Sequence, residues 1–303
     1  MVLPVGWRVN EADWVRLVRQ LRRGDCTPLL GAGACYGRLP TGKELSKHFA
    51  KEYGFPFADH GNLAHVMQYA AHVHNDPTDL KVEVCAYLKQ RAAGATDPLD
   101  PHTVLAEFPI KTFLTTNYDD FMLQALQHCR KGPRTPNVCR STWWEPTKRA
   151  VVPDPDPDHP LIYHLHGNWD DPSSIVLTEN DYVQYLLNLR DVDDANGRQL
   201  LPIPEPVLDA MTSSPLLFLG YSLQDWNFRV LFHGLIKSIP STRQRRHISV
   251  QLLPELNTSL TDAEDLAGEY LKSYYADLKI SIYVGTTSAF FKELLDWNAR
   301  TPL

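Results

Sequence analysis

Four short apolar stretches of this sequence each end in residues that could bind or cleave a ligand. The residues that follow them are GAGAC at 31–35, TTNYD at 115–119, HLHGN at 164–168 and GYSLQD at 220–225. The carboxyl ends of parallel strands share one edge of a sheet, and open α/β sheets bind their ligands at that edge. If the four stretches are such strands, the sequence predicts one ligand site built from all four endings.

The glycine-rich ending fits two phosphate-binding patterns. Gly31, Ala32 and Gly33 directly follow an apolar stretch, where backbone N–H groups can face a pyrophosphate, although glycine there can also serve close packing alone. Residues 37–43 spell G-x-x-x-x-G-K, but Glu44 stands where a triphosphate loop needs Ser or Thr for magnesium. Thr41 and Glu44 have capping-box spacing instead. The loop therefore favours a dinucleotide over a triphosphate.

The second and third endings carry groups suited to bond cleavage. The amide of Asn117 can hold a carboxamide or a water molecule, and the carboxylate of Asp119 can accept an N–H. An imidazole such as His166, with an ordinary pKa near neutrality, suits a general base. Each of these residues also has a structural alternative, as a turn former or a packed side chain. His164 and His166 could pair on a metal, but no third ligand accompanies them, so we expect no metal.

Composition sets the broad class. The chain has 303 residues, 43% of them apolar and 22% charged, with a net charge of −6 and a pI of about 6.0. That charge argues against broad nucleic-acid binding, although it leaves room for a local basic patch. No run approaches the ~20 apolar residues of a membrane span, and the N-terminus does not resemble a secretory signal.

Cysteine usage points to a reducing compartment. The five cysteines are an odd number at wide spacings, with no C-x-x-C pair. A disulfide framework and a four-cysteine zinc site are therefore both unexpected. We expect a cytoplasmic protein.

Strand-like and helical patterns alternate along the chain. We expect helices at 11–23, from Thr41 onward, and at 62–74, 79–93, 120–129, 178–190, 262–278 and 288–299. We expect strands at 27–30, 110–117, 161–168, 215–222, 247–253 and 279–285. This alternation predicts an α/β, Rossmann-like, doubly wound parallel sheet of about six strands. Residues 1–303 are expected to form one domain, with a helical insertion at 55–107 and a long loop at 131–160.

Taken in order, the four endings resemble motifs of the sirtuin family. GAGAC is similar to its GAG loop, TTNYD to its T-Q-N-x-D element, LHGN to its catalytic H-G, and GYSL to its G-T-S-L. The resemblance spans roughly residues 27–285 and implies that the ligand is NAD.

The resemblance also implies a role for each matching residue. Asn117 and Asp119 would hold the nicotinamide and its ribose, and His166 would be the base near the ribose; these three are the expected catalytic residues. The glycine loop would line the pyrophosphate, and Gly220 and Ser222 would contact the adenosine side. The expected NAD-binding residues are Gly31, Ala32, Gly33, Ala34, Cys35, Thr116, Asn117, Gly220 and Ser222.

Departures from the family pattern redirect the expected activity. Residues 168–219 contain no cysteine, so the zinc ribbon of sirtuin deacylases is absent, and their F-G-E segment is missing too. The loop that covers nicotinamide in sirtuins reads CYGRLPTGKEL here, and Thr116 replaces the glutamine of T-Q-N. The chain thus looks like the sirtuin-like domains of prokaryotic antiphage defence, which hydrolyse NAD and often assemble with a HerA-type ATPase. This resemblance implies a homo-oligomeric NAD glycohydrolase that stops phage growth by depleting NAD.

Three alternatives remain open at this point. The chain could be a non-catalytic sensor of NAD or ADP-ribose that regulates a partner. It could be a zinc-free protein deacylase. It could also be a scaffold whose degenerate pocket is blocked by Trp143, Trp144 or the 131–160 loop.

Overall fold

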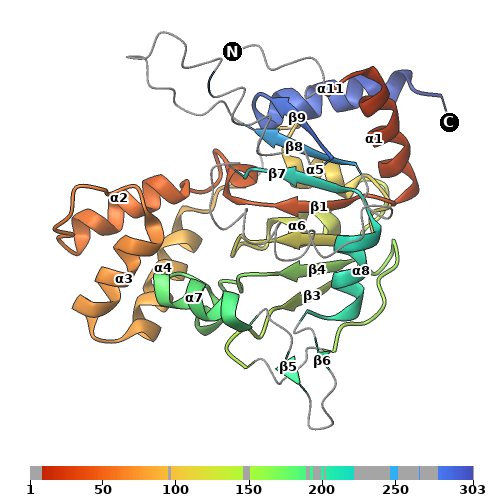
Figure 1. The fold of residues 1–303 in the computed structure, drawn as a ribbon. Coiled ribbons are helices and arrows are strands. Elements are labelled where there is room, and N and C mark those ends of the chain that lie inside the picture. The colour runs from red at the N-terminus through yellow and green to blue at the C-terminus, as the bar shows by residue number, and fades with distance from the viewer. Residues whose placement is uncertain are drawn as a thin grey trace.

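The computed structural model describes residues 9–94, 97–145, 151–188, 192–193, 199–200, 203–221, 246–251, 266 and 279–302. Its centre is a parallel sheet with the strand order β3-β4-β2-β1-β7-β8-β9 (Figure 1). The strands are β1 (Thr27–Leu30), β2 (Thr112–Thr115), β3 (Asn137–Arg140), β4 (Leu161–His164), β7 (Leu216–Leu219), β8 (His247–Gln251) and β9 (Ile280–Val284). The predicted α/β parallel fold is confirmed.

The sheet is wound in two directions from β1. Leu30 pairs with Thr115 of β2 on one side and with Leu219 of β7 on the other. Along the chain, the strands β2, β3 and β4 on one side of β1 come before the strands β7, β8 and β9 on the other side. Such a switch point opens a crevice at the carboxyl ends of the central strands, and β1, β2 and β7 all end beside it.

One strand of the central sheet was not expected from the sequence. Residues 137–140, within the predicted 131–160 loop, form the edge strand β3 and pair in parallel with β4. The sheet therefore has seven strands where about six were predicted. The sequence NVCR has no apolar run, and Val138 on this edge is exposed, so the pattern of a buried strand is missing.

Apolar side chains cover both faces of the sheet. Leu29 packs in a cluster on one face, together with Tyr163 and Phe218, whereas its neighbour Leu30 packs in a second cluster with Phe113. A parallel sheet buried on both faces needs such continuous apolar strands. This explains why β1, β2, β4 and β7 read as short apolar runs.

The helices begin and end where local signals place them. α1 (Glu11–Arg23) starts at a capping box on Asn10 and stops at Gly24, which has φ +70°. α2 (Gly42–Glu52) starts at the predicted capping box of Thr41 and Glu44. The other α-helices are α3 (Leu63–His74), α4 (Pro77–Arg91), α5 (Pro101–Ala106), α6 (Phe121–Gln127), α7 (Glu179–Asn188), α8 (Glu205–Ser213) and α11 (Thr287–Arg300). The helix expected at 262–278 falls, apart from Leu266, outside the described residues.

The predicted 55–107 segment is helical, but its parts pack differently. α3 and α4 pack with α2 around Phe49 and Val84 in a third apolar cluster, beyond the end of the sheet (Figure 1). α5 instead contributes Val104 and Leu105 to the cluster that covers the sheet. Only the part up to α4 therefore stands apart from the sheet.

The segment between β4 and β7 consists, in its described part, of short helical elements and a small hairpin. Its described residues form a 3-10 turn η2 (Pro172–Ser174), α7, the short hairpin β5 (Val192–Asp193) and β6 (Gln199–Leu200), and α8. The sequence of this segment has no cysteine. Among the described helices, none combines the length and apolar character needed to cross a membrane.

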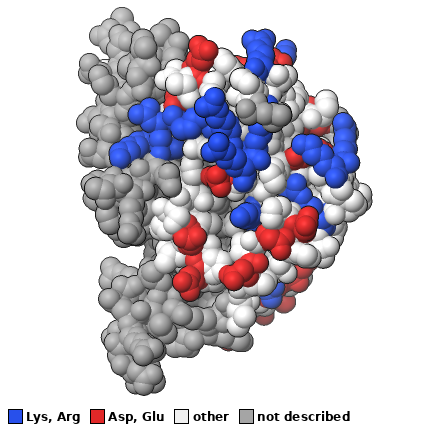
Figure 2. All heavy atoms as spheres, turned by 90° about the vertical axis from the view of Figure 1, so that its right-hand side faces the viewer, with Lys and Arg blue, Asp and Glu red and all other residues white. Residues whose placement is uncertain are grey.

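Basic side chains gather on the face that carries α1 (Figure 2). Two of the α1 arginines already have partners within the fold. An Arg16 Nη lies 2.6 Å from a carboxylate oxygen of Asp13, and Arg22 Nε donates to Asn298 at 2.9 Å. The basic face is thus partly used to stabilise the helix and to attach the end of α11, and it gives no independent argument for nucleic-acid binding.

Candidate functional site

A cavity of about 830 Å³ lies between the carboxyl ends of the central strands and the helices α2, α3 and α4. Such a volume is in the range of small-molecule and cofactor sites. Residues from α2, α3 and α4 close one side of it, and the endings of β1, β2, β4 and β7 form the other. Of the residues expected at the site, it is lined by Ala32, Cys35, Thr116, Asn117, Asp119, His166 and Gly220.

The glycine loop folds into a 3-10 turn η1 (Ala32–Cys35), and most of its amides point inward. The Gly31 N–H donates to the Leu219 carbonyl at 2.8 Å, Gly33 to Gly220 at 3.0 Å, and Ala34 to Gly31 at 2.9 Å. Gly31, Gly33 and Ala34 do not line the cavity. The loop residues on its wall are Ala32 and Cys35, so the glycines shape the loop while these two face the ligand space.

Close packing explains why the loop needs glycine. A Cβ added at Gly33 would lie 2.8 Å from the Gly220 Cα, and one added at Gly220 would lie 2.2 Å from the Ala34 nitrogen. Gly220 also has φ +76°, which disfavours any side chain. These glycines therefore serve close packing, because they allow the loop after β1 to contact the loop after β7.

Asn117 is held firmly at the cavity wall. Its Nδ2 donates to the Gly31 carbonyl at 3.0 Å and to the Cys35 Sγ at 3.1 Å. Its backbone N–H donates to Thr115 Oγ1 at 2.9 Å, and its carbonyl lies 3.0 Å from His164 Nδ1. These bonds leave the Asn117 side chain little freedom to turn away from the site.

Asp119 and Cys35 form one hydrogen-bonded pair. The Cys35 thiol donates to Asp119 Oδ2 at 3.1 Å, while Oδ1 accepts the Phe121 N–H at 3.0 Å. Burial, together with the neighbouring Asp119 carboxylate, raises the pKa of the Cys35 thiol well above its ordinary value. At neutral pH the sulfur therefore keeps its proton and is a donor rather than a nucleophile.

His166 lies at the cavity with an apolar environment behind it. Tyr182 and Tyr185 meet its ring edge-on, with centroid distances of 5.6 and 5.0 Å. Burial lowers the pKa of His166 to about 3, so the expectation of a near-neutral pKa was wrong. The physical reason is desolvation, which disfavours the charged imidazolium. The ring is neutral at physiological pH and can accept a proton.

Gly167 allows the chain to turn directly after His166. It has φ +77°, and an added Cβ would lie 2.2 Å from the Ser174 carbonyl oxygen. The two histidines face different spaces, because His164 lines a small cavity of about 30 Å³ whereas His166 lines the large one. Among the described residues, the cluster with metal-ligand spacing contains neither of them, so the two-histidine metal pair finds no support.

The suggested blocking of the pocket finds no support in the described residues. Trp143 is buried, and its Nε1 donates to the Ser174 carbonyl at 2.7 Å. Neither Trp143 nor Trp144 lines the large cavity, and no described residue of the 131–160 loop does. Neither tryptophan therefore blocks the cavity as far as the described residues define it.

Several cavity residues were missed by sequence reasoning. Tyr221 lies over Gly31, and its hydroxyl contacts the Leu30 carbonyl at 2.9 Å and Thr116 Oγ1 at 2.8 Å. Lys43 brings a positive charge to the wall, although the triphosphate pattern that contains it was rejected. The α3 residues of the wall, Leu63 and Ala64, lie in a segment without a motif. Ser222, expected on the adenosine side, lies outside the described residues.

Sequence comparison relates the chain to one family. Residues 111–278, more than half of the chain, match the SIR2-like domain family. A protein from Enterococcus faecium named NAD(+) hydrolase ThsA is 24% identical over 260 residues, which cover 86% of this chain and 49% of that protein.

Proteins of the same name from Bacillus cereus (strain MSX-D12) and Acinetobacter baumannii (strain 532279) are also 24% identical. The first match covers 67% of this chain and 38% of that protein, and the second covers 78% and 44%. The chain thus spans about half, or less, of the length of the curated relatives it matches.

Proposed function

The chain belongs to the SIR2-like domain family, and from that premise we propose that its large cavity binds NAD and hydrolyses it to nicotinamide and ADP-ribose. One observation carries the proposal most directly: Asn117, Asp119 and His166 come from two different strand endings and line the same cavity. The name NAD(+) hydrolase, carried by relatives that match most of this chain, supports the same activity.

The reaction breaks the bond between the ribose C1′ and the nicotinamide nitrogen. Its transition state resembles an oxocarbenium ion, as in glycoside hydrolysis. Nicotinamide leaves with the bonding electron pair and becomes neutral, so the departure needs no acid. Water adds its oxygen to C1′ and loses one proton. The protein has to position the reactants and accept that proton.

Each of the three residues has a role that its surroundings support. Asn117, fixed by Gly31 and Cys35, orients the water or the nicotinamide carboxamide. The Asp119 carboxylate holds nicotinamide by accepting an N–H. His166 takes the proton, directly or through a ribose hydroxyl. An imidazole whose protonated form has a pKa of about 3 is a weak base. This step therefore needs the negative pyrophosphate of bound NAD to raise the pKa of His166.

The cavity wall suggests how the rest of NAD would lie. Ala32 and Cys35 would face the pyrophosphate, with Lys43 supplying a positive charge on the same wall. Thr116 and Gly220 lie near the central strands, and Gly220, with Ser222, would meet the adenosine side. Gly31, Gly33 and Ala34 would act through the shape of the loop. The chain would work as one NAD-binding domain.

The resemblance to antiphage-defence domains extends the proposal to a biological role. The protein would be a cytoplasmic, homo-oligomeric effector that depletes NAD, with a HerA-type ATPase as its partner. All five cysteines are free thiols, which suits a reducing compartment.

Incubation of the purified chain with NAD, alone and with its genomic neighbour, tests the proposal. Equal amounts of nicotinamide and ADP-ribose are expected. Tight NAD binding without nicotinamide release, also in the assembled complex, would favour the sensor instead. Release of O-acetyl-ADP-ribose only when an acylated peptide is present would favour a deacylase.

A further inference from the structure

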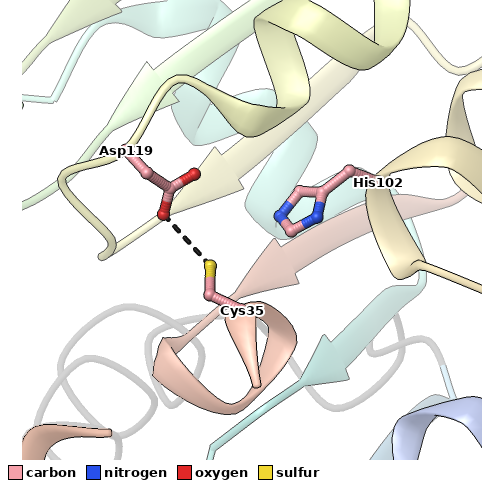
Figure 3. Close-up of side chains that lie close together, drawn as sticks. All are labelled: Cys35, His102 and Asp119. Carbon is pink, nitrogen blue, oxygen red and sulfur yellow. Dashed lines mark hydrogen bonds between the residues drawn. The ribbon is translucent and has the colours of Figure 1, made fainter. Parts of the chain in front are cut away.

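Three side chains with zinc-binding atoms meet beside the cavity. The Cys35 sulfur, one ring nitrogen of His102 and one carboxylate oxygen of Asp119 all lie within 4.8 Å of one another (Figure 3). All three residues are buried. They come from η1, from α5 and from the loop after β2, so the fold brings together residues that are distant in sequence. Thiolate, imidazole and carboxylate are the ligands that zinc prefers.

His102 is oriented as a metal ligand would be. Its Nδ1 lies 3.5 Å from Asp100 Oδ1, and no described group makes a hydrogen bond to that buried nitrogen. The other ring nitrogen points toward the thiol and the carboxylate (Figure 3). A carboxylate behind the far nitrogen is the usual arrangement for zinc-bound histidine, because it fixes the tautomer and the ring.

Asp100 lies where a carboxylate can orient His102. Its Oδ1 lies 3.5 Å from His102 Nδ1 and accepts the Thr103 N–H at 3.0 Å, and Arg38 Nη1 lies 3.5 Å from its Oδ2. A proton on His102 Nδ1, facing this carboxylate, leaves the opposite ring nitrogen free to bind a metal.

An ion can reach this cluster and find an open position there. Cys35 and Asp119 line the cavity of about 830 Å³, which provides the entry. His102 and Asp119 also line the small cavity of about 30 Å³ next to it, which is large enough for one water molecule. Three protein ligands and a water would complete the four-coordinate shell of zinc.

We propose that Cys35, His102 and Asp119 bind one Zn²⁺ ion, and that this ion inhibits the site rather than serving it as a cofactor. The zinc ion replaces the thiol proton of Cys35, which is released to solvent, and takes electron pairs from sulfur, nitrogen and oxygen. Zinc bonds are about 2.0–2.3 Å long, and the three ligand atoms already lie within 4.8 Å of one another, so small side-chain adjustments suffice to place them around one ion.

Inhibition follows from what the zinc ion takes away. Asp119 can no longer accept an N–H from nicotinamide once it is a metal ligand. Asn117, which donates to the Cys35 sulfur at 3.1 Å, loses a well-positioned acceptor when that sulfur turns to the metal. The inhibition rests on the proposed NAD cleavage, whereas the binding of zinc does not.

Titration of the full chain with Co²⁺, followed by competition with Zn²⁺, tests the binding. One Co²⁺ per chain is expected, with a thiolate-to-cobalt charge-transfer band and the release of one proton. The Cys35→Ser variant should lose the band. The Asp100→Asn variant should keep the band but bind about 10–100-fold more weakly, because the orientation of His102 is lost.

Matched controls separate these effects from misfolding. Cys139→Ser removes a more accessible thiol on β3 and should change neither the band nor the affinity. Thermal unfolding without metal identifies any variant that has lost the fold, and His102→Gln gives a second ligand deletion. No charge-transfer band with the wild-type chain, or an unchanged band in Cys35→Ser, would overturn the proposal.

The inhibitory part has its own test. Added Zn²⁺ should suppress nicotinamide release, a chelator should restore it, and Cys35→Ser should be much less sensitive relative to its own zinc-free rate. If zinc binds but the rate stays the same, inhibition is refuted while the binding site stands. If the chain cleaves no NAD at all, the cobalt titration still decides whether the site exists.

Discussion

The Gly33 N–H donates to the Gly220 carbonyl at 3.0 Å, which joins the loop after β1 to the loop after β7. The two residues are neighbours only because β1 and β7 lie side by side in the sheet. Both are glycines because the backbones touch there. This contact sets the shape of the cavity wall on which Ala32, Cys35 and Gly220 lie.

Gly220→Ala should therefore destabilise the fold and the site together. The added Cβ would lie 2.2 Å from the Ala34 nitrogen, at a residue with φ +76°. Strain and overpacking together should lower the free energy of unfolding by about 3 kcal/mol or more, as measured in urea. Gly94, with nothing within 4 Å of an added Cβ, is the control, and Gly94→Ala should stay within about 0.5 kcal/mol. Equal stability of the two variants would contradict this account.

The local patterns were sufficient to predict the central strands. β1 (Thr27–Leu30) and α1 (Glu11–Arg23) have the predicted bounds, because their apolar periodicity and flanking residues are unambiguous. Asn117, Asp119 and His166 were expected at one edge of the sheet because each closely follows a buried strand, and all three line the same cavity. Parallel strands bring their carboxyl ends together whatever the details of packing.

Other features depend on contacts that a single sequence does not reveal. His102 is an ordinary histidine in a short helix, and only the packing of α5 against α6 brings its ring beside Cys35 and Asp119. The low pKa of His166 depends on Tyr182 and Tyr185, which come from α7 and desolvate the ring.

A buried ion pair attaches the helices beyond the sheet to α7. Lys81 Nζ of α4 lies 3.0 Å from Asp181 Oδ1, with both side chains largely buried, and it also lies over the Trp143 ring. Lys81→Ala would leave the carboxylate buried without its cation, at a cost of about 3 kcal/mol. In this variant the Asp181 carboxylate still accepts hydrogen bonds from the N–H groups of Leu177 and Thr178. The expected loss of stability is therefore at the lower end of the usual range.

The exposed pair Lys89–Asp170 is the natural comparison. It has a similar distance of 2.8 Å but much larger side-chain exposure, so Lys89→Ala should cost less than about 1 kcal/mol. Urea unfolding of both variants measures the difference. If Lys81→Ala were as mild as Lys89→Ala, the pair would not stabilise this interface.

Buried histidines should make the protein less stable in mild acid. Burial lowers the pKa of His166 to about 3 and that of His247 to about 4, and it also lowers the pKa of His164. Below the ordinary value of about 6.5, the unfolded chain binds protons that the folded chain does not. Each histidine then removes up to about 1.4 kcal/mol per pH unit from the free energy of unfolding as the pH falls.

Urea unfolding at about pH 7 and about pH 5 measures this loss. The window lies above the range in which Asp100, with a pKa of about 2, loses its stabilising charge, so histidines dominate it. His166→Gln should reduce the pH dependence, whereas His72→Gln, on the exposed side of α3, should leave it unchanged. A pH dependence that is the same in both variants would show that His166 is not held neutral by the fold.

Nicotinamide release from NAD by the wild-type chain and by Asn117→Ala and His166→Ala tests the central claim most directly. NAD binding and thermal unfolding are measured on the same samples, to separate lost chemistry from a lost site or fold. We predict equal release of nicotinamide and ADP-ribose by the wild-type chain, and a loss of about 100-fold or more in the rate of each folded, NAD-binding variant. Full NAD cleavage by either variant would contradict the assignment of these residues as catalytic.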